Sequence, residues 1–196
     1  MTEKIGDAEK KELAKRIAGA VERTPFREGA YDLKTFVLPF YENALDVHIK
    51  CFTTRPVITK EYVCDDTRVF ETDGEEETLV EINKALNLKL TADNVVDYTG
   101  FYFRKVAIGD DFVRLIRSAA DLTDDNFDEE LQANLKALIT APEVGRTEDG
   151  FGVSGFVLSD DTLFKTRMSV KKDGSLSIDD EEIVYDGLPL HRIMLR

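Results

Sequence analysis

Histidine and cysteine, which often supply metal ligands and nucleophiles, occur only twice each in this 196-residue chain. His48 lies between Asp46 and Lys50, where a neighbouring carboxylate could orient it as a general base. The alternative is an ordinary solvated histidine on the exposed face of a strand. His191 either closes an edge of the core or is exposed. Because no Cys or His has a short metal-ligand spacing, we expect neither a metal site nor a cofactor.

The two cysteines are predicted to be free thiols. Cys51 follows Leu45, Val47 and Ile49 at a spacing of two, so it should face the core as a small hydrophobic side chain. A turn at residues 54–56 would place Cys51 opposite Lys60 and leave roughly 13 Å to Cys64, too far for a disulfide. Asp65 and Asp66 should raise the pKa of the neighbouring Cys64 thiol. Free thiols favour a reducing, cytoplasmic location.

The net charge of −13 excludes several classes of partner. Nucleic acids and anionic membranes are bound mainly through Lys and Arg, so neither is an expected partner. No run of about 18 apolar residues is present to span a membrane. The acidic runs do not fit a calcium-binding EF-hand loop, because its first ligand position would fall on Val69 or Ser169. Residues 75–77 and 124–130 instead open predicted helices, where carboxylates complement the backbone dipole.

One cluster of basic and aromatic residues remains as a candidate binding site. The segment 99–106 superficially resembles an aromatic RNA-binding strand, but Tyr102 replaces a small residue and the chain is acidic. The same segment could direct Tyr102, Arg104 and Arg114 towards a small anion or a protein carboxylate. Together with His48, these are the candidate ligand- or partner-binding residues. No phosphate-loop, dinucleotide-binding, hydrolase-elbow or zinc-protease motif occurs, so no catalytic residue is assigned.

Hydrophobic periodicity predicts the elements that would position these residues. Apolar spacings of three and four predict helices over residues 7–23, 73–87 and 124–139. Alternation predicts strands over 45–51, 57–64 and 67–72. Residues 27–41 show no sustained period and are expected to form an irregular connection. Residues 101–108 and 112–117 flank Gly109-Asp110 and are expected to form a hairpin, for which two registers remain possible.

The C-terminal part is predicted to be a three-stranded meander. A two-residue turn at Asp173-Gly174 would place polar groups on the buried face. A three-residue loop with Gly174 in the left-handed conformation instead pairs Val170 with Leu176 and Met168 with Ile178. We therefore expect the three-residue loop. It would also set Arg167 opposite Asp179 and Lys165 opposite Glu181 on the exposed face.

These elements predict an α+β fold with a mainly antiparallel sheet of about eight strands and three main helices packed on it. We expect a single domain over residues 1–196, with residues 1–34 as N-terminal helix and connection and 35–196 as the body. The missing catalytic motifs favour a non-catalytic cytoplasmic module that binds a protein partner or forms a homodimer through a sheet face or edge. The alternative is a small-molecule-binding or enzymatic domain with a pocket between sheet and helix.

Overall fold

A computed structural model describes residues 6–21, 26–27, 29–108 and 113–190. His191 and the Gly109-Asp110 turn signal lie outside these residues. The helices are α1 (Asp7–Ala20), α2 (Glu76–Ala85), α3 (Val95–Lys105) and α4 (Glu129–Leu138), with a 3₁₀ turn at Ala119–Asp121. The strands are β1 (Tyr31–Val37), β2 (Leu45–Cys51), β3 (Ile58–Cys64), β4 (Val69–Glu71), β5 (Val113–Ile116), β6 (Glu143–Arg146), β7 (Gly150–Ser159), β8 (Thr162–Lys171) and β9 (Leu176–Tyr185).

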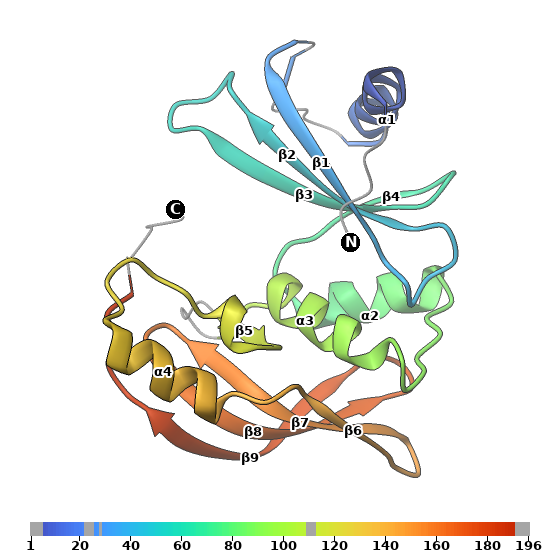
Figure 1. Cartoon of the computed structure of the whole chain (residues 1–196). Helices are drawn as coiled ribbons and strands as arrows, with labels where there is room; N and C mark the ends of the chain where they lie inside the picture. Colours follow the sequence, from blue (N-terminus) through green and yellow to red (C-terminus); the bar gives the residue numbers. More distant parts are fainter. Residues whose placement is uncertain (1–5, 22–25, 28, 109–112, 191–196) are drawn as a thin grey trace.

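The predicted α+β class with antiparallel strands is confirmed, and the strands divide between two sheets (Figure 1). The first sheet is a meander in the order β1-β2-β3-β4. The second has the order β5-β7-β8-β9, with β6 also paired to β7. Helices α2 and α3 lie between the sheets, whereas α1 covers the far side of the first sheet. None of the described helices is long and apolar enough to cross a bilayer.

The prediction of an irregular connection over residues 27–41 is wrong, because β1 occupies Tyr31–Val37. Leu33 and Thr35 are buried and Asp32 and Lys34 are exposed, which is the alternation of a strand. The polar Thr35 on the buried face hid this alternation in the sequence. The strand also crosses residue 34, where the sequence suggested a division between connection and body.

The prediction of a strand over residues 101–108 is wrong, since α3 continues to Lys105. Aromatic residues favour strands on average, but packing decides here. Val95, Tyr98, Phe101 and Lys105 are all buried, and their spacing of three and four residues places them on one side of a helix. The helix lies between two sheets, so apolar side chains all around it find partners.

The other helices follow the predicted apolar stripes with shifted ends. Helix α4 begins at Glu129 instead of Asp124, because Asp128 is its N-cap and accepts a hydrogen bond from Leu131 N at 2.8 Å. Helix α2 begins at Glu76, while Asp73 lies before it and accepts a bond from Thr78. Helix α1 begins at Asp7 but ends at Ala20.

The three-residue loop between β8 and β9 is confirmed. Val170 pairs with Leu176, Met168 pairs with Ile178, and Gly174 has φ +90°. The predicted charge pairs are wrong by one residue: Arg167 lies opposite Asp180, and Lys165 lies opposite Glu182. A bulge in β9 between these pairs and Ile178 shifts the register.

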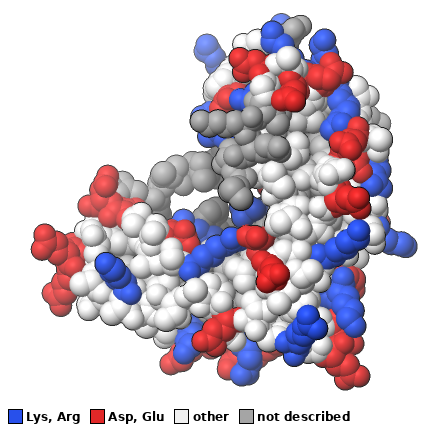
Figure 2. Space-filling view, turned by 45° about the vertical axis from the view of Figure 1, so that its right-hand side comes forward, with Lys and Arg blue, Asp and Glu red and all other residues white. Residues whose placement is uncertain are grey.

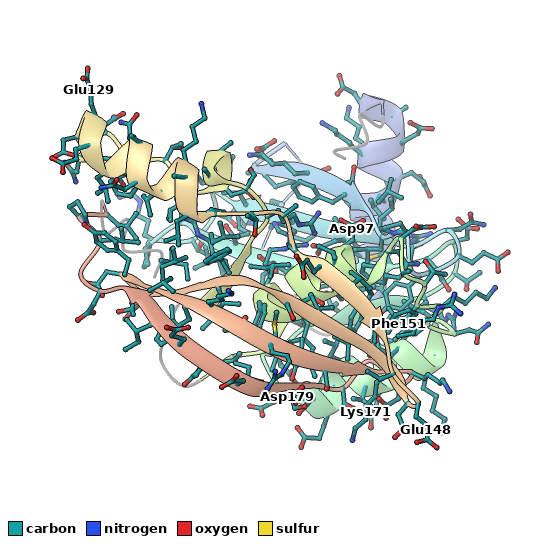
Figure 3. The ribbon with its side chains drawn as sticks, turned by 60° about the horizontal axis from the view of Figure 1, so that its bottom comes forward. Asp97, Glu129, Glu148, Phe151, Lys171 and Asp179 are labelled. Carbon is teal, nitrogen blue, oxygen red and sulfur yellow. The ribbon has the colours of Figure 1, made fainter. Side chains whose placement is uncertain are left out.

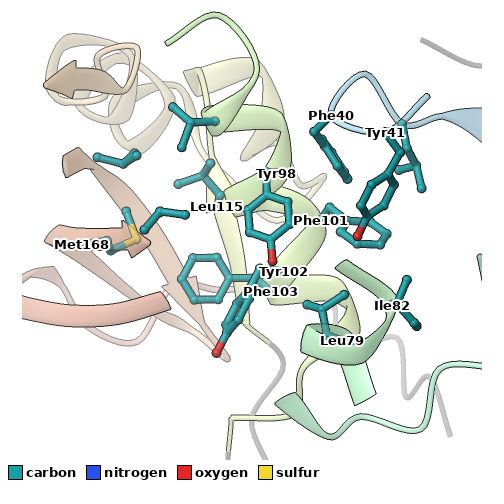
Figure 4. Close-up of a cluster of buried hydrophobic side chains, with 14 of the residues drawn as sticks. Phe40, Tyr41, Leu79, Ile82, Tyr98, Phe101, Tyr102, Phe103, Leu115 and Met168 are labelled. Atoms are coloured by element: carbon teal, nitrogen blue, oxygen red, sulfur yellow. The ribbon is translucent and has the colours of Figure 1, made fainter. Parts of the chain in front are cut away.

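Alternate side chains of β7 reach different parts of the core. Val153 and Val157 join the central cluster with α2 and α3, whereas Phe156 and Leu158 pack with α4. Both faces of the second sheet are therefore covered along β7. The central cluster is rich in aromatic rings (Figure 4), and Phe40 packs edge-on against Tyr98 at a centroid distance of 5.1 Å.

A buried polar network links this core to the β8–β9 loop. The Tyr41 hydroxyl donates to Asn83 Oδ1, and Asn83 Nδ2 donates to Tyr98 Oη at 2.8 Å. The Tyr98 hydroxyl donates to the carbonyl of Gly174 at 2.7 Å, and Asn83 also donates to Asp173 O at 2.9 Å. These bonds tie α2, α3 and the loop together at one point.

Candidate functional site

Four ionisable side chains meet where the first sheet faces the C-terminal end of α3. Asp46 and His48 project from one face of β2, and Glu61 projects from β3 opposite His48. Lys105, the last residue of α3, reaches the same point. We call Asp46, His48, Glu61 and Lys105 the charge cluster.

The distances within the charge cluster are short. Lys105 Nζ lies 2.7 Å from Asp46 Oδ1 and 2.5 Å from Glu61 Oε2. His48 Nε2 lies 3.1 Å from Asp46 Oδ2, and its Nδ1 lies 3.6 Å from Glu61 Oε1. Phe36 of β1 packs against the imidazole with a centroid distance of 5.1 Å, and Lys105 Nζ lies 5.7 Å from the centre of the Phe101 ring.

Burial differs strongly across the charge cluster. The Asp46 and Lys105 side chains are each 1% exposed, whereas His48 is 24% and Glu61 is 32% exposed. Burial alone would raise the pKa of Asp46, but the contact with His48 and the charge of Lys105 outweigh it and hold the pKa below its usual value. Asp46 is therefore a buried carboxylate matched by nearby positive charge.

This arrangement clamps α3 to the first sheet. The Lys105 ammonium contacts a carboxylate from each of two neighbouring strands and so joins the helix to both. Removing one partner of such a pair would leave an unmatched buried charge, which typically costs about 3–5 kcal/mol. A carboxylate was predicted to orient His48 as a base, and Asp46 does contact its Nε2 atom. The other ring nitrogen, Nδ1, faces a second carboxylate, Glu61, instead of open space for a substrate. We therefore regard the charge cluster first as a structural clamp.

The other predicted binding residues do not converge with His48. Tyr102 is buried and donates its hydroxyl to Glu76 Oε1 at 2.9 Å; burial, and then Glu76, raise its pKa. Arg104 is exposed and donates to Gly100 O at 2.9 Å. Two residues apart on a helix, their side chains point about 200° apart, so the expected common surface is not formed.

Arg114 lies on β5 and is half-buried. Its Nε atom is buried with no hydrogen-bond partner in the described part of the chain, and burial lowers the pKa of its guanidinium. No hydrogen bond or ion pair joins Arg114 to Tyr102 or Arg104 within the described ranges. Tyr102, Arg104 and Arg114 therefore do not form one binding site.

Asp46, Glu61 and Lys105 are not among the site residues predicted from the sequence. The alternation of β2 already placed Asp46 on the face of His48, which was the available signal. Glu61 required the register between β2 and β3. Lys105 required the knowledge that residues 95–105 form a helix.

Both thiols are free, as predicted, and both are buried, which had been predicted for Cys51 alone. Cys51 is fully buried among the side chains that pack under α1, and Cys64 lies nearby in the same cluster. Burial raises the pKa of Cys64 to about 12, with Arg16 opposing and Asp65 adding to the rise. The β2–β3 turn is centred one residue earlier than expected, so Cys51 lies opposite Ile58 instead of Lys60. Neither thiol is placed for reactivity.

Two grooves lie elsewhere on the described surface. A groove of about 610 Å³ opens between the α2–α3 loop and the β6–β7 turn, lined among others by Lys89, Arg146 and Phe151. A smaller groove of about 120 Å³ lies beside α1. The alternative function, a small-molecule-binding or enzymatic domain, would place His48 or Arg104 in a pocket between sheet and helix. Neither groove contains either residue.

The outer strand of the second sheet has an unusual exposure. Strand β9 pairs only with β8 among the described strands, and residues 177–183 are exposed without interruption. Ile183 is 59% exposed and Ile178 is 39% exposed. Figure 3 shows β9 as the outer border of the sheet, with Asp179 labelled on it. We call residues 177–183 the acidic edge.

The charges of the acidic edge are only partly matched. Asp180 pairs with Arg167 at 3.3 Å, and Asp179 accepts a hydrogen bond from Ser169 at 2.6 Å. Glu181 and Glu182 form no ion pair with other described residues. The face of the molecule in Figure 2 carries Lys and Arg as well as Asp and Glu.

Comparison with known proteins gives no match: no family model, no curated protein sequence and no solved structure is significantly similar to this chain. Function must therefore be argued from the surfaces and the clusters described above.

Proposed function

We propose that this chain is a non-catalytic binding module that pairs the acidic edge with an extended basic segment of a protein partner. The observation that carries the proposal is a ten-residue strand that borders its sheet and is exposed over seven consecutive residues. The free N–H and C=O groups of a border strand can pair with an added strand. Ile178 and Ile183 would supply apolar contacts, and the carboxylates would select the partner.

Charge determines the kind of partner. Natural sheets often use charged side chains and bulges to prevent pairing at an exposed edge, and β9 has both. Two copies of β9 in antiparallel pairing about Asp180 and Glu181 would set carboxylates opposite carboxylates, which is unfavourable. A segment with Lys or Arg at alternate positions would instead form favourable cross-strand pairs with the carboxylates on one face of β9, such as Asp180 and Glu182. The same charges thus oppose self-association through β9 and favour a basic partner.

The direct test uses a labelled synthetic peptide that alternates Lys and Val over ten residues. Fluorescence anisotropy is expected to show binding that weakens as salt is raised, because the pairs are exposed. A Glu-Val peptide should bind at least tenfold more weakly. A Lys-Pro peptide of equal charge cannot donate from its proline positions and should also bind more weakly. Equal binding of the Lys-Val and Lys-Pro peptides would reduce the effect to nonspecific attraction and refute strand addition.

Matched variants and hydrogen exchange locate the binding. Glu181→Lys together with Glu182→Lys should reverse the preference between the Lys-Val and Glu-Val peptides. Asp32→Lys, on the border strand β1 of the other sheet, should not. Amide exchange should slow within residues 176–185 when the Lys-Val peptide binds. Protection confined to another segment would overturn the assignment to β9.

Self-association has its own test. We expect a monomer in light scattering at high micromolar concentration and at low salt. A dimer that persists in the Glu181→Lys, Glu182→Lys variant would show that another surface mediates self-association.

A further inference from the structure

Three side chains of the charge cluster have the composition of a divalent-metal site. One ligand atom each from Asp46, His48 and Glu61 lies within 4.8 Å of the other two. One imidazole and two carboxylates suit zinc, manganese and cobalt. Asp46 and His48 are two residues apart on one strand, and Glu61 is the cross-strand partner of His48, so the sheet fixes all three.

The buried member of this trio lacks directed hydrogen bonds. Neither oxygen of Asp46 accepts a well-oriented hydrogen bond from another described residue, and His48 Nε2 is likewise buried without one. Buried polar atoms are normally satisfied, so such atoms mark a position that favours a cation. The partial exposure of His48 and Glu61 leaves a route by which an ion can reach the trio.

Lys105 already supplies a cation at this position. Its ammonium lies within ion-pair distance of both carboxylates, at 2.7 Å from Asp46 and 2.5 Å from Glu61. A divalent ion would need the same two carboxylates and would be repelled by the ammonium. The two cations therefore compete for one place.

We propose that Asp46, His48 and Glu61 form a divalent-cation site that Lys105 occupies and keeps closed. Lys105 is then a built-in cation that replaces a metal ion in holding α3 to the first sheet. Removing its charge while keeping a similar side-chain length opens the site to a metal. This inference does not depend on the partner proposed for β9.

The test compares the unmodified chain with Lys105→Met, using Co²⁺ absorption spectra and Zn²⁺ calorimetry. We expect Lys105→Met to bind one ion per chain, at least 100-fold more tightly than the unmodified chain. Adding Asp46→Asn to Lys105→Met should abolish this binding. Lys89→Met, which removes an exposed lysine, should leave metal affinity as it is in the unmodified chain.

Loss of Lys105 also removes a clamp, so folding is part of the readout. If Lys105→Met is unstable, Zn²⁺ should raise its melting temperature while Mg²⁺ should not, and Lys105→Gln provides a second, polar variant for the same measurement. Absence of binding and of Zn²⁺ stabilisation in both variants would overturn the proposal. So would an unmodified chain that binds Zn²⁺ as tightly as Lys105→Met, because Lys105 would then not close the site.

Discussion

Gly174→Ala should be among the most damaging single-methyl additions to this chain. Gly174 has φ +90°, a conformation that residues with a side chain adopt only with strain. A Cβ atom there would lie 2.2 Å from Tyr98 Oη and 2.3 Å from Asn83 Nδ2. Both atoms belong to the buried polar network, so neither can move without breaking hydrogen bonds.

The magnitude follows from two contributions. The left-handed conformation costs an alanine about 1–2 kcal/mol. Displacing Tyr98 and Asn83 leaves buried polar groups without partners, at about 1–3 kcal/mol for each lost bond. With one bond lost at each of these two residues, we expect the free energy of unfolding to fall by about 3–8 kcal/mol in total, which for a chain of this size lowers the melting temperature by about 6–32 °C.

Gly187→Ala is the matched control. Gly187 has φ +70°, and a Cβ atom there would meet nothing within 4 Å. Its variant should therefore lose only the conformational part, about 1–2 kcal/mol. Urea unfolding of both variants measures the difference. A Gly174→Ala variant that loses no more stability than Gly187→Ala would refute the argument that the network is rigidly packed around the loop.

Three further predictions concern ionisable groups. Cys64, with its pKa raised to about 12, should resist thiol reagents in the folded protein at pH 8, where only denaturant should make it reactive. The unfolded pKa of Cys64 is near 9, so its thiol should lower the free energy of unfolding as pH rises from about 9 to about 12, by at most about 1.4 kcal/mol per pH unit. Cys64→Ala should make the measured slope shallower, and buried tyrosines such as Tyr62 should account for the rest. Burial would raise the pKa of Asp65, but Arg68 and the amides of Thr67 and Arg68 lower it to about 2. Asp65→Asn should therefore lower the free energy of unfolding by about 1–2 kcal/mol at pH 7, and by progressively less as pH falls from about 4 to 2. An equally large loss of stability at pH 2 and at pH 7 would contradict this.

Local patterns predicted most strands of this fold. The bounds of β2 are as predicted from the alternation of Leu45, Val47, Ile49 and Cys51. The β8–β9 loop followed from the parity of its flanking side chains, because only one loop length keeps Val170 and Leu176 on the same face. Both arguments use residues that are close in the sequence. The bulge in β9 was not visible in this way, because exposed polar residues set no register.

The central helix α3 could not be predicted by the same means. Its run of aromatic residues has a high propensity for strands, and its helical period is masked because nearly every position is buried between two layers. The charge cluster depends on this helix for Lys105 and on strand pairing for Glu61. Its members are separated by up to 59 residues (46 to 105), and only the tertiary structure brings them together.

The contrast between the charge cluster and the acidic edge indicates where a partner should bind. In the charge cluster, burial makes an unmatched charge costly, and each carboxylate accordingly has a cation within ion-pair distance. On β9, water screens the carboxylates, so Glu181 and Glu182 can stand without ion pairs at little cost to folding. Because folding does not depend on pairing these two carboxylates, they are available to bind a partner. Substitutions at Glu181 and Glu182 should therefore change peptide binding with little effect on the free energy of unfolding, whereas substitutions at Asp46 and Lys105 should do the reverse.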